Sequence, residues 1–216
     1  MVRAMGYEAG PMQVLVISDF VCPWCYLGLV EIERVEREYL VEVRHVPYLL
    51  DPSTPPEGKP RRPMTRPGDP PTEMELRAEA AGVRFSRGRT WTSNSVLAHE
   101  GAEFAHEAGR ARAFVREMFR AYFTELEDIG QLEVVVGVGE RAGLDPRELR
   151  AALEAHTYRG RVLEAVGWTR EAGISGVPTF VFGDRFAMSG AQDAAVFDAV
   201  MDRLGVPRRE AAQGEA

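Results

Sequence analysis

Residues 12–28 read MQVLVISDFVCPWCYLG, and this stretch holds both cysteines of the 216-residue chain, Cys22 and Cys25. Its first six residues are apolar except for one glutamine and rich in β-branched side chains, which predicts a buried strand. From Cys25 to Tyr39, apolar residues recur at approximately helical spacing among charged ones, which predicts a helix. The local order is therefore strand, C-P-W-C and helix.

This order places Cys22 at the N-terminus of the expected helix. Unpaired backbone N–H groups and the positive end of the helix dipole favour a thiolate over a thiol at that position. The thiolate is the attacking species in thiol–disulfide exchange. Cys25, one turn further along, is placed to attack a mixed disulfide at Cys22 and release the substrate. We therefore expect Cys22 to be the nucleophile and Cys25 the resolving thiol.

Two other interpretations of the cysteine pair stay open. A structural disulfide across two residues would constrain little of the unfolded chain and would stabilise it weakly. A zinc site would need two further ligands, and none of the four histidines stands in an H-x-H or H-x₃₋₅-H arrangement. A C-x-x-C motif between a strand and a helix is more typical of a redox site.

Composition fits a soluble enzyme, because 45% of the residues are hydrophobic and the chain is long enough to bury a sizeable core. The net charge of −7 and the lack of a basic block predict no nucleic-acid partner. No apolar run approaches the roughly 20 residues of a membrane span, and the first ten residues lack the apolar region of a secretory signal. We therefore expect a cytoplasmic protein without a membrane partner, in which a disulfide would be transient and catalytic.

A second informative segment, at residues 176–190, reads GVPTFVFGDRFAMSG. It predicts a strand from Thr179 to Phe182, a turn and a second strand, and an amphipathic helix follows. A proline that opens a strand is typical of a strand start or a sheet edge. The sharper interpretation is a cis Val177–Pro178 bond that exposes the Val177 backbone beside the cysteines, where an extended peptide could pair with it.

The whole succession of elements resembles the thioredoxin superfamily and, within it, the DsbA family, with the FrnE-like subgroup as the closer match. The segments that carry the resemblance are SDFVCPWCYLG at 18–28, NSVLAH at 94–99, FRAYF at 119–123, DIG at 128–130, and residues 176–192. The similarity spans about residues 12–205. It implies a nucleophilic Cys22, a resolving Cys25 and a cis-proline at Pro178.

The resemblance also implies an α/β thioredoxin fold, in which helices flank a mixed central sheet and an all-helical domain is inserted between the β-α-β and β-β-α halves. We expect the N-terminal half at 12–50, a proline-rich loop with the helical insertion at 51–172, the C-terminal half at 173–206 and a disordered tail at 207–216. Substrate contacts are expected from Pro23, Trp24, Val177 and Pro178.

The chain departs from the family pattern at two positions. Many thioredoxin-like proteins carry a buried acid six residues before the first cysteine, where this chain has Val16. Asp19 is the nearest substitute, or it is a residue that caps the strand end. Strongly oxidising DsbA proteins have a histidine between the cysteines, whereas Trp24 brings no positive charge. We therefore expect Cys22 to be less acidic, and its disulfide less oxidising, than in those enzymes.

Residues 51–72 hold eight of the fourteen prolines, which predicts an extended loop that either lies near the active-site face or is a solvated connector. Helices are expected at 73–82, 94–108, 110–127, 131–142, 146–156 and 158–172. Thr72 with Glu75 predicts a capping box, and Asp145 before a proline predicts a firm helix start. Asn94 and His99 either reach the rim of the active site or serve only the start and the packing of their helix.

The expected activity is disulfide exchange with protein or small-molecule thiols, in either redox direction, recycled by a cellular thiol reductant or oxidant. No cofactor is expected besides the Cys22–Cys25 disulfide, and glutathione is a candidate for exchange. A glutathione-linked transferase or isomerase, of the kappa or hydroxychromene-carboxylate isomerase kind, is an alternative, although such proteins normally carry serine at the first active-site position. A peptide-binding holdase is a further alternative, and a homodimer is left open.

Overall fold

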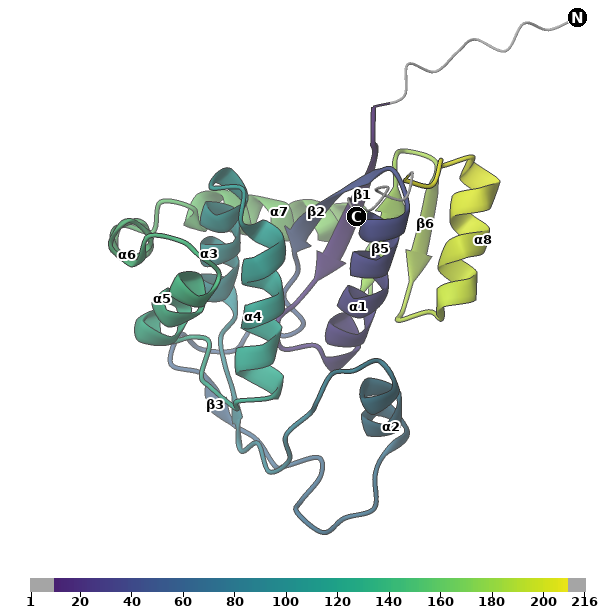
Figure 1. Cartoon of the computed structure of the whole chain (residues 1–216). Coiled ribbons are helices and arrows are strands. Elements are labelled where there is room, and N and C mark those ends of the chain that lie inside the picture. Colours follow the sequence, from purple (N-terminus) through teal and green to yellow (C-terminus); the bar gives the residue numbers. More distant parts are fainter. Residues whose placement is uncertain (1–9, 210–216) are drawn as a thin grey trace, which may run out of the picture.

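The computed structural model describes residues 10–209, and at its centre lies a four-stranded mixed sheet with the order β2-β1-β5-β6 (Figure 1). Strand β1 (Met12–Ser18) runs parallel to β2 (Val41–Pro47) and antiparallel to β5 (Thr179–Phe182). Strand β6 (Phe186–Ser189) pairs with β5 at the edge of the sheet. The predicted α/β fold with a mixed central sheet is confirmed.

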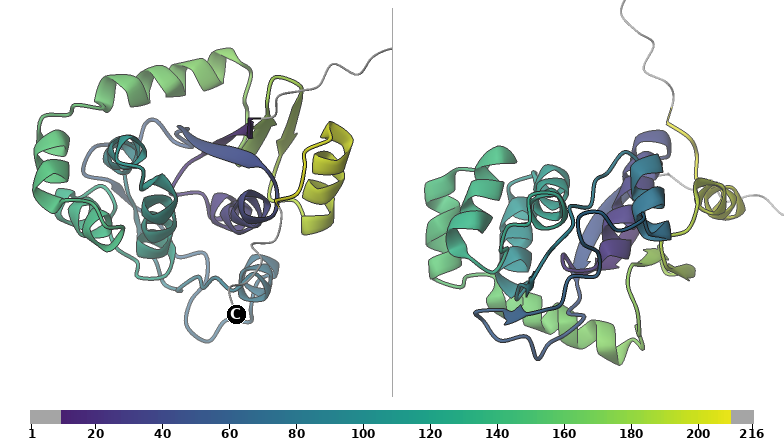
Figure 2. Two further views of the ribbon diagram at one scale, coloured as in Figure 1. Left: turned by 45° about the horizontal axis from the view of Figure 1, so that its top comes forward. Right: turned by 90° about the horizontal axis from the view of Figure 1, so that it is seen from below.

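Helices cover both faces of this sheet. Helix α1 (Pro23–Glu38) and helix α8 (Ala194–Leu204) lie on one side, and α7 (Arg159–Glu171) lies on the other, against β2 (Figure 2). The expected insertion ends at residue 172, so it contains α7. One helix of the predicted insertion therefore also covers the sheet of the thioredoxin-like part.

The remaining elements lie between β2 and α7 in the sequence. They are β3 (Lys59–Pro60), α2 (Glu73–Ala80), β4 (Trp91–Thr92), α3 (Val96–Glu107), α4 (Ala111–Phe123), α5 (Leu132–Arg141) and α6 (Pro146–Glu154). Helix α3 packs against all of α4, α5, α6 and α7. Strands β3 and β4 form a short antiparallel pair that the sequence did not predict.

Two helix starts follow the predicted capping chemistry. The Thr72 hydroxyl accepts from the Glu75 backbone N–H at 3.2 Å, and the Glu75 carboxylate accepts from the Thr72 N–H at 2.8 Å, so the capping box at α2 is confirmed. The Asp145 carboxylate accepts from the N–H groups of Arg147 and Glu148 at 2.8 and 3.2 Å. Each cap satisfies backbone donors that a helix leaves unpaired in its first turn.

Helix α4 ends at Phe123, four residues before the predicted end at residue 127. The Ser86 N–H donates to the Phe123 carbonyl at 2.8 Å, and the Ser86 hydroxyl donates to the Thr124 carbonyl at 2.5 Å. The Thr124 hydroxyl in turn donates to the Arg84 carbonyl. A segment from before α3 therefore takes the carbonyl groups that a longer helix would use, and no local pattern reveals such a contact.

An aromatic cluster joins the thioredoxin-like part to the helical insertion. The ring centres of Phe20 and Phe119 lie 5.1 Å apart, and Tyr26 stacks on Phe119 at 5.4 Å and on Phe123 at 5.9 Å. Phe20 and Tyr26 flank the C-P-W-C motif in sequence, whereas the two phenylalanines come from α4. The motif is therefore held against the insertion by packed aromatic rings.

The structure differs from the predicted disordered tail at residues 207–209. The Pro207 carbonyl accepts from the Leu40 N–H at 2.8 Å, and the Arg209 N–H donates to the Glu38 carbonyl at 2.8 Å. These hydrogen bonds fasten the chain to the end of α1. The rest of the predicted tail, 210–216, and the N-terminal residues 1–9 lie outside the described residues. Among residues 10–209, no helix is both long enough and apolar enough to span a membrane.

Candidate active site

Cys22 is the residue that caps the N-terminus of α1, with Pro23 as the first helical residue. Its carbonyl accepts from the Cys25 N–H at 3.1 Å, and its own N–H donates to the Asp19 carbonyl at 3.0 Å. Both cysteines are free thiols and nearly buried, with exposed fractions of 3% for Cys22 and 2% for Cys25. Neither sulfur is therefore openly exposed at the protein surface.

The two thiols have opposite electrostatic environments. A hydrogen bond from the Cys25 side chain lowers the pKa of the Cys22 thiol, and the N–H groups of Cys25 and Trp24 lower it further, against the opposing effect of burial. Burial raises the pKa of Cys25 well above its ordinary value, and its hydrogen bond to Cys22 adds to this effect. The site therefore favours a thiolate at Cys22 and a thiol at Cys25, the division of roles that exchange requires.

The predicted Val177–Pro178 segment lies directly against Cys22. The Val177–Pro178 peptide bond is cis, and the Cys22 thiol donates to the Val177 carbonyl oxygen with Sγ 3.6 Å away. Helix α1 approaches closely at Gly28, where an added Cβ would lie 3.0 Å from Pro178 Cγ and 3.0 Å from Phe180 Cζ. Glycine at position 28 thus allows α1 to lie close to Pro178. The fold therefore brings Cys22 next to the Val177–Pro178 bond, which lies 155 residues further along the chain.

Trp24 is the most exposed residue of the motif, with 38% of its surface accessible. The guanidinium carbon of Arg77 lies 5.5 Å from the centre of the Trp24 ring, a cation–π contact, and Arg77 also donates to the Ala191 carbonyl at 2.9 Å. Trp24 itself brings no charge, but α2 places a cation beside the motif. The sequence holds no signal for this contact, because α2 reaches the motif only in the folded chain.

Asp19 is buried beneath the motif. Its carboxylate accepts from the Leu50 N–H at 2.8 Å and from the Val21 N–H at 3.4 Å, which agrees with its interpretation as a capping residue at the strand end. His99 Nε2 lies 3.7 Å from Asp19 Oδ1, and the His99 ring packs on Phe20 at 4.8 Å. A proton-relay role for Asp19 stays a prediction.

Asn94 connects two segments through its side-chain amide. Its carbonyl oxygen accepts from the Val96 N–H at 3.0 Å, and its amide donates to the Thr54 carbonyl at 2.7 Å. It therefore supports the start of α3 and fastens the proline-rich loop. In residues 10–209, no group of three or more His, Cys, Asp or Glu side chains is arranged to hold a metal ion.

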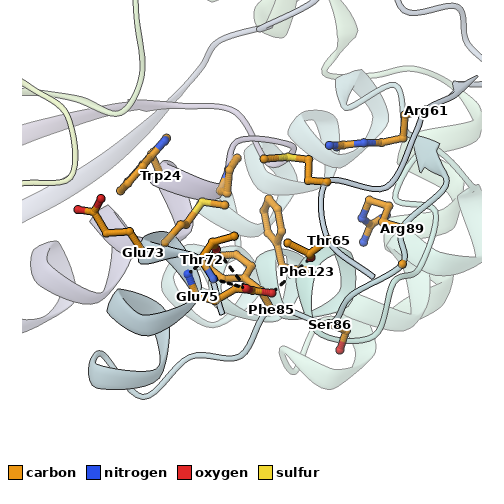
Figure 3. Close-up of a pocket in the computed structure, with 14 residues that line it drawn as sticks. Trp24, Arg61, Thr65, Thr72, Glu73, Glu75, Phe85, Ser86, Arg89 and Phe123 are labelled. Carbon is orange, nitrogen blue, oxygen red and sulfur yellow. Dashed lines mark hydrogen bonds between the residues drawn. The ribbon is translucent and has the colours of Figure 1, made fainter. Parts of the chain in front are cut away.

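A pocket of about 370 Å³ opens beside Pro23 and Trp24 (Figure 3). The proline-rich loop contributes Arg61, Met64 and Thr65 to its wall, so this part of the loop lies next to the motif and is not a remote connector. The other lining residues are Thr72, Glu73, Met74, Glu75, Phe85, Ser86, Gly88, Arg89 and Phe123. Beyond the alternative that the loop at 51–72 lies near the active-site face, the sequence pointed to none of the lining residues outside the motif, because four separate segments contribute them.

The pH dependence of alkylation should separate the two thiols. With iodoacetamide, we expect the rate at Cys22 to rise with pH and reach half its maximum below the ordinary thiol pKa, because only the thiolate reacts. Cys25 should react slowly until the pH is well above that value. Mass mapping of the modified peptides across a pH series, with each Cys→Ser variant as control, gives both profiles. Equal profiles for the two sulfurs would contradict the unequal environments.

Comparisons with known proteins agree with this architecture. The family model described as DSBA-like thioredoxin domain matches residues 13–202. The uncharacterized protein YwbO of Bacillus subtilis (strain 168) is 31% identical over 189 residues, which cover 87% of this chain and 94% of YwbO.

Two solved structures are similar over nearly their whole length. The probable DsbA oxidoreductase SCO1869 from Streptomyces coelicolor has a TM-score of 0.78 at 26% identity, with 95% of this chain and 94% of that chain covered. A 2-hydroxychromene-2-carboxylate isomerase has a TM-score of 0.70 at 19% identity, with 90% and 96% covered, and this second likeness concerns the fold alone.

Proposed function

Because the chain belongs to the family of DSBA-like thioredoxin domains, we propose that it is a thiol–disulfide oxidoreductase acting through Cys22 and Cys25. The Cys22 thiolate attacks a substrate disulfide, forming a mixed disulfide and releasing one thiolate. Cys25 then attacks the Cys22 sulfur, releases the second thiol and leaves a Cys22–Cys25 disulfide. Two electrons pass from the dithiol to the substrate, and the reverse sequence oxidises a substrate dithiol.

The observation that carries this proposal is the contrast between the two thiols. The Cys22 pKa is lowered by a hydrogen bond from Cys25, whereas burial raises the pKa of Cys25. A pair of equivalent thiols would not distinguish an attacking sulfur from a resolving one. The same contrast supports Cys25 as the group that holds its proton until the mixed disulfide has formed.

The Val177 backbone is the proposed binding site for the substrate peptide. Its carbonyl oxygen lies 3.6 Å from Cys22 Sγ, so a peptide that pairs in extended form with the Val177 backbone would carry its own cysteine close to the nucleophile. Pro23 and Trp24 lie on the side of the motif that borders the pocket. We propose these residues and Pro178 as the substrate contacts.

The cellular setting belongs to the same proposal. We propose a cytoplasmic enzyme that exchanges electrons with a low-molecular-weight thiol such as glutathione. Membership of the FrnE-like subgroup stays a prediction, and we propose the exchange in either redox direction and leave the homodimer open. The cysteine at position 22 argues against a glutathione transferase or isomerase, since those relatives normally carry serine there.

Turnover and client binding can be separated in one experiment. Reduction of insulin disulfides in a glutathione buffer and suppression of the aggregation of a heat-unfolded client are measured for the wild type and for a double variant with Cys22→Ser and Cys25→Ser. We expect the double variant to lose all catalysed insulin reduction, because it has no thiol. Full retention of client protection in the variant, together with no insulin reduction by the wild type, would overturn the proposal in favour of a holdase.

A further inference from the structure

The wall of the pocket beside Trp24 carries two arginines without an acidic partner. Arg61 and Arg89 lie on one side of the pocket, and Trp24 and Glu73 lie on the other (Figure 3). No carboxylate of the described residues lies within 4.0 Å of the Arg61 or Arg89 guanidinium. Most of the remaining wall is apolar, formed in part by Met64, Met74, Phe85 and Phe123.

Arg89 is held in place by an aromatic ring instead of an acid. Its guanidinium lies 3.6 Å from the centre of the Tyr122 ring, and its Nη2 atom is buried without a hydrogen-bond partner. The Tyr122 hydroxyl is also buried without a partner. Burial lowers the pKa of Arg89, and the charge of Arg61 lowers it further, while Tyr122 and the charge of Asp128 oppose both. A buried cation without a counterion is destabilising unless something else compensates it.

The nearby acids are used elsewhere. Both carboxylate oxygens of Glu75 accept from Arg87, at 2.8 and 2.9 Å, and Glu75 also caps α2. Asp128 accepts from the Gly130 N–H at 3.1 Å and from the Gln131 amide at 3.0 Å. Glu73 lies across the pocket, beside Trp24 (Figure 3). The arginine side of the pocket therefore carries two positive charges next to an apolar wall. The Asp128 carboxylate acts on Arg89 from a distance but forms no ion pair with it.

We propose that this pocket selects small disulfides whose halves combine an apolar, aromatic frame with a carboxylate. Arg61 and Arg89 would bind the carboxylate, and the methionine and aromatic side chains would contact the frame. The volume of about 370 Å³ lies in the range of roughly 300–1,000 Å³ found for small-molecule sites. The proposal rests on the proposed function, because it concerns the substrate of the same cysteines.

The bound disulfide would react by the ordinary exchange. The Cys22 thiolate attacks one sulfur, the substrate S–S bond breaks, and one aryl thiolate leaves. Cys25 attacks the mixed disulfide and releases the second aryl thiolate, while its proton passes to solvent. The enzyme dithiol is oxidised to the Cys22–Cys25 disulfide, and the substrate takes up the two electrons.

Two aromatic disulfides that differ in charge provide the test. Dithiobis(nitrobenzoate) carries a carboxylate on each ring, whereas dithiodipyridine is neutral. For the reduced enzyme, kcat/KM is measured with both through the absorbance of the released thiol, and the anionic-to-neutral ratio is calculated for each variant. This ratio cancels any loss of folded protein and any change in Cys22 reactivity, since both affect the two reagents alike.

We expect Arg61→Gln and Arg89→Gln each to lower this ratio about tenfold, the effect of losing one charge-assisted hydrogen bond. Arg62→Gln is the matched control, because it removes the same charge from the adjacent exposed residue outside the pocket, and its ratio should not change. If Arg89→Gln fails to fold, Arg61→Gln alone decides, since Arg61 lies on a half-exposed loop and no ion pair holds its side chain within residues 10–209.

Failure of this inference is distinct from failure of the proposed function. Unchanged ratios in both pocket variants, with both reagents still reduced by the wild type, would overturn the substrate class and leave the oxidoreductase intact. An equal loss of kcat/KM with both reagents would show that the arginines only support the fold. That result would also overturn the proposed substrate class. Undiminished reduction of both reagents by Cys22→Ser would instead contradict the proposed function.

Discussion

Replacing Cys22 by serine is expected to lower disulfide turnover by at least about a thousandfold, the scale of losing a nucleophile in covalent catalysis. Serine has no comparably acidic group at pH 7, so the N-terminus of α1 and the Cys25 thiol would have no thiolate to stabilise. Turnover of a small neutral disulfide, followed by thiol release, measures the effect. Circular dichroism should show that the variant remains folded, because the change exchanges a single buried atom.

Replacing Cys25 by serine should give a different result. The first attack by Cys22 still proceeds, but no second thiol resolves the product, so the enzyme accumulates as a mixed disulfide. Mass spectrometry of the intact protein should show the mass of one substrate half added to each molecule, and a reductant should remove it. An adduct on Cys25 in the Cys22→Ser variant, formed as fast as the adduct on Cys22, would contradict the assignment of roles.

Among the variants proposed here, Phe119→Ala is expected to destabilise the protein most. We expect it to lower the free energy of unfolding by about 3–5 kcal/mol. Phe119 is fully buried and contacts the rings of both Phe20 and Tyr26. Truncation would leave a cavity where α4 meets the segment that carries the cysteines. Equilibrium unfolding in urea, followed by fluorescence and by circular dichroism, measures the change.

Phe104→Ala is the matched control, since the same chemical change is made at a partly buried ring of α3, whose aromatic contact is an edge-on approach to Tyr158 at 6.2 Å. We expect it to cost less than half as much as Phe119→Ala. Similar losses in the free energy of unfolding for the two variants would contradict this expectation. The aromatic cluster at Phe119 would then stabilise the fold no more than the packing of any other phenylalanine.

The elements that the sequence predicted well depend on local signals. The strand before Cys22 and the helix after Cys25 each carry their own periodicity, and Thr72 and Asp145 mark helix starts by their capping chemistry. The order of strand, C-P-W-C and helix placed Cys22 at a helix N-terminus. The helix and the caps need no knowledge of the distant chain, because their hydrogen bonds join residues at most four positions apart. The strand pairs with distant strands, but its run of apolar, β-branched residues already marks it.

The features that the sequence did not predict depend on contacts between distant segments. Strand β3 ends in Pro60, which argues against a strand, yet it pairs with Trp91 across thirty residues at the edge of a two-stranded ribbon. The cation beside Trp24 comes from Arg77. Arg89 gave no signal in the sequence, because its contact with Tyr122 and its unpaired Nη2 atom exist only once the distant segments have packed together.

The most direct test of the account is an equilibrium titration of the Cys22–Cys25 pair against glutathione buffers, followed by tryptophan fluorescence, with Cys22→Ser as control. We predict one reversible two-electron transition in the wild type and none in the variant. Because Trp24 replaces the histidine of strongly oxidising relatives, the midpoint should be more negative than about −120 mV. If no disulfide forms between Cys22 and Cys25 at any glutathione ratio, the central claim of a redox-active pair is contradicted.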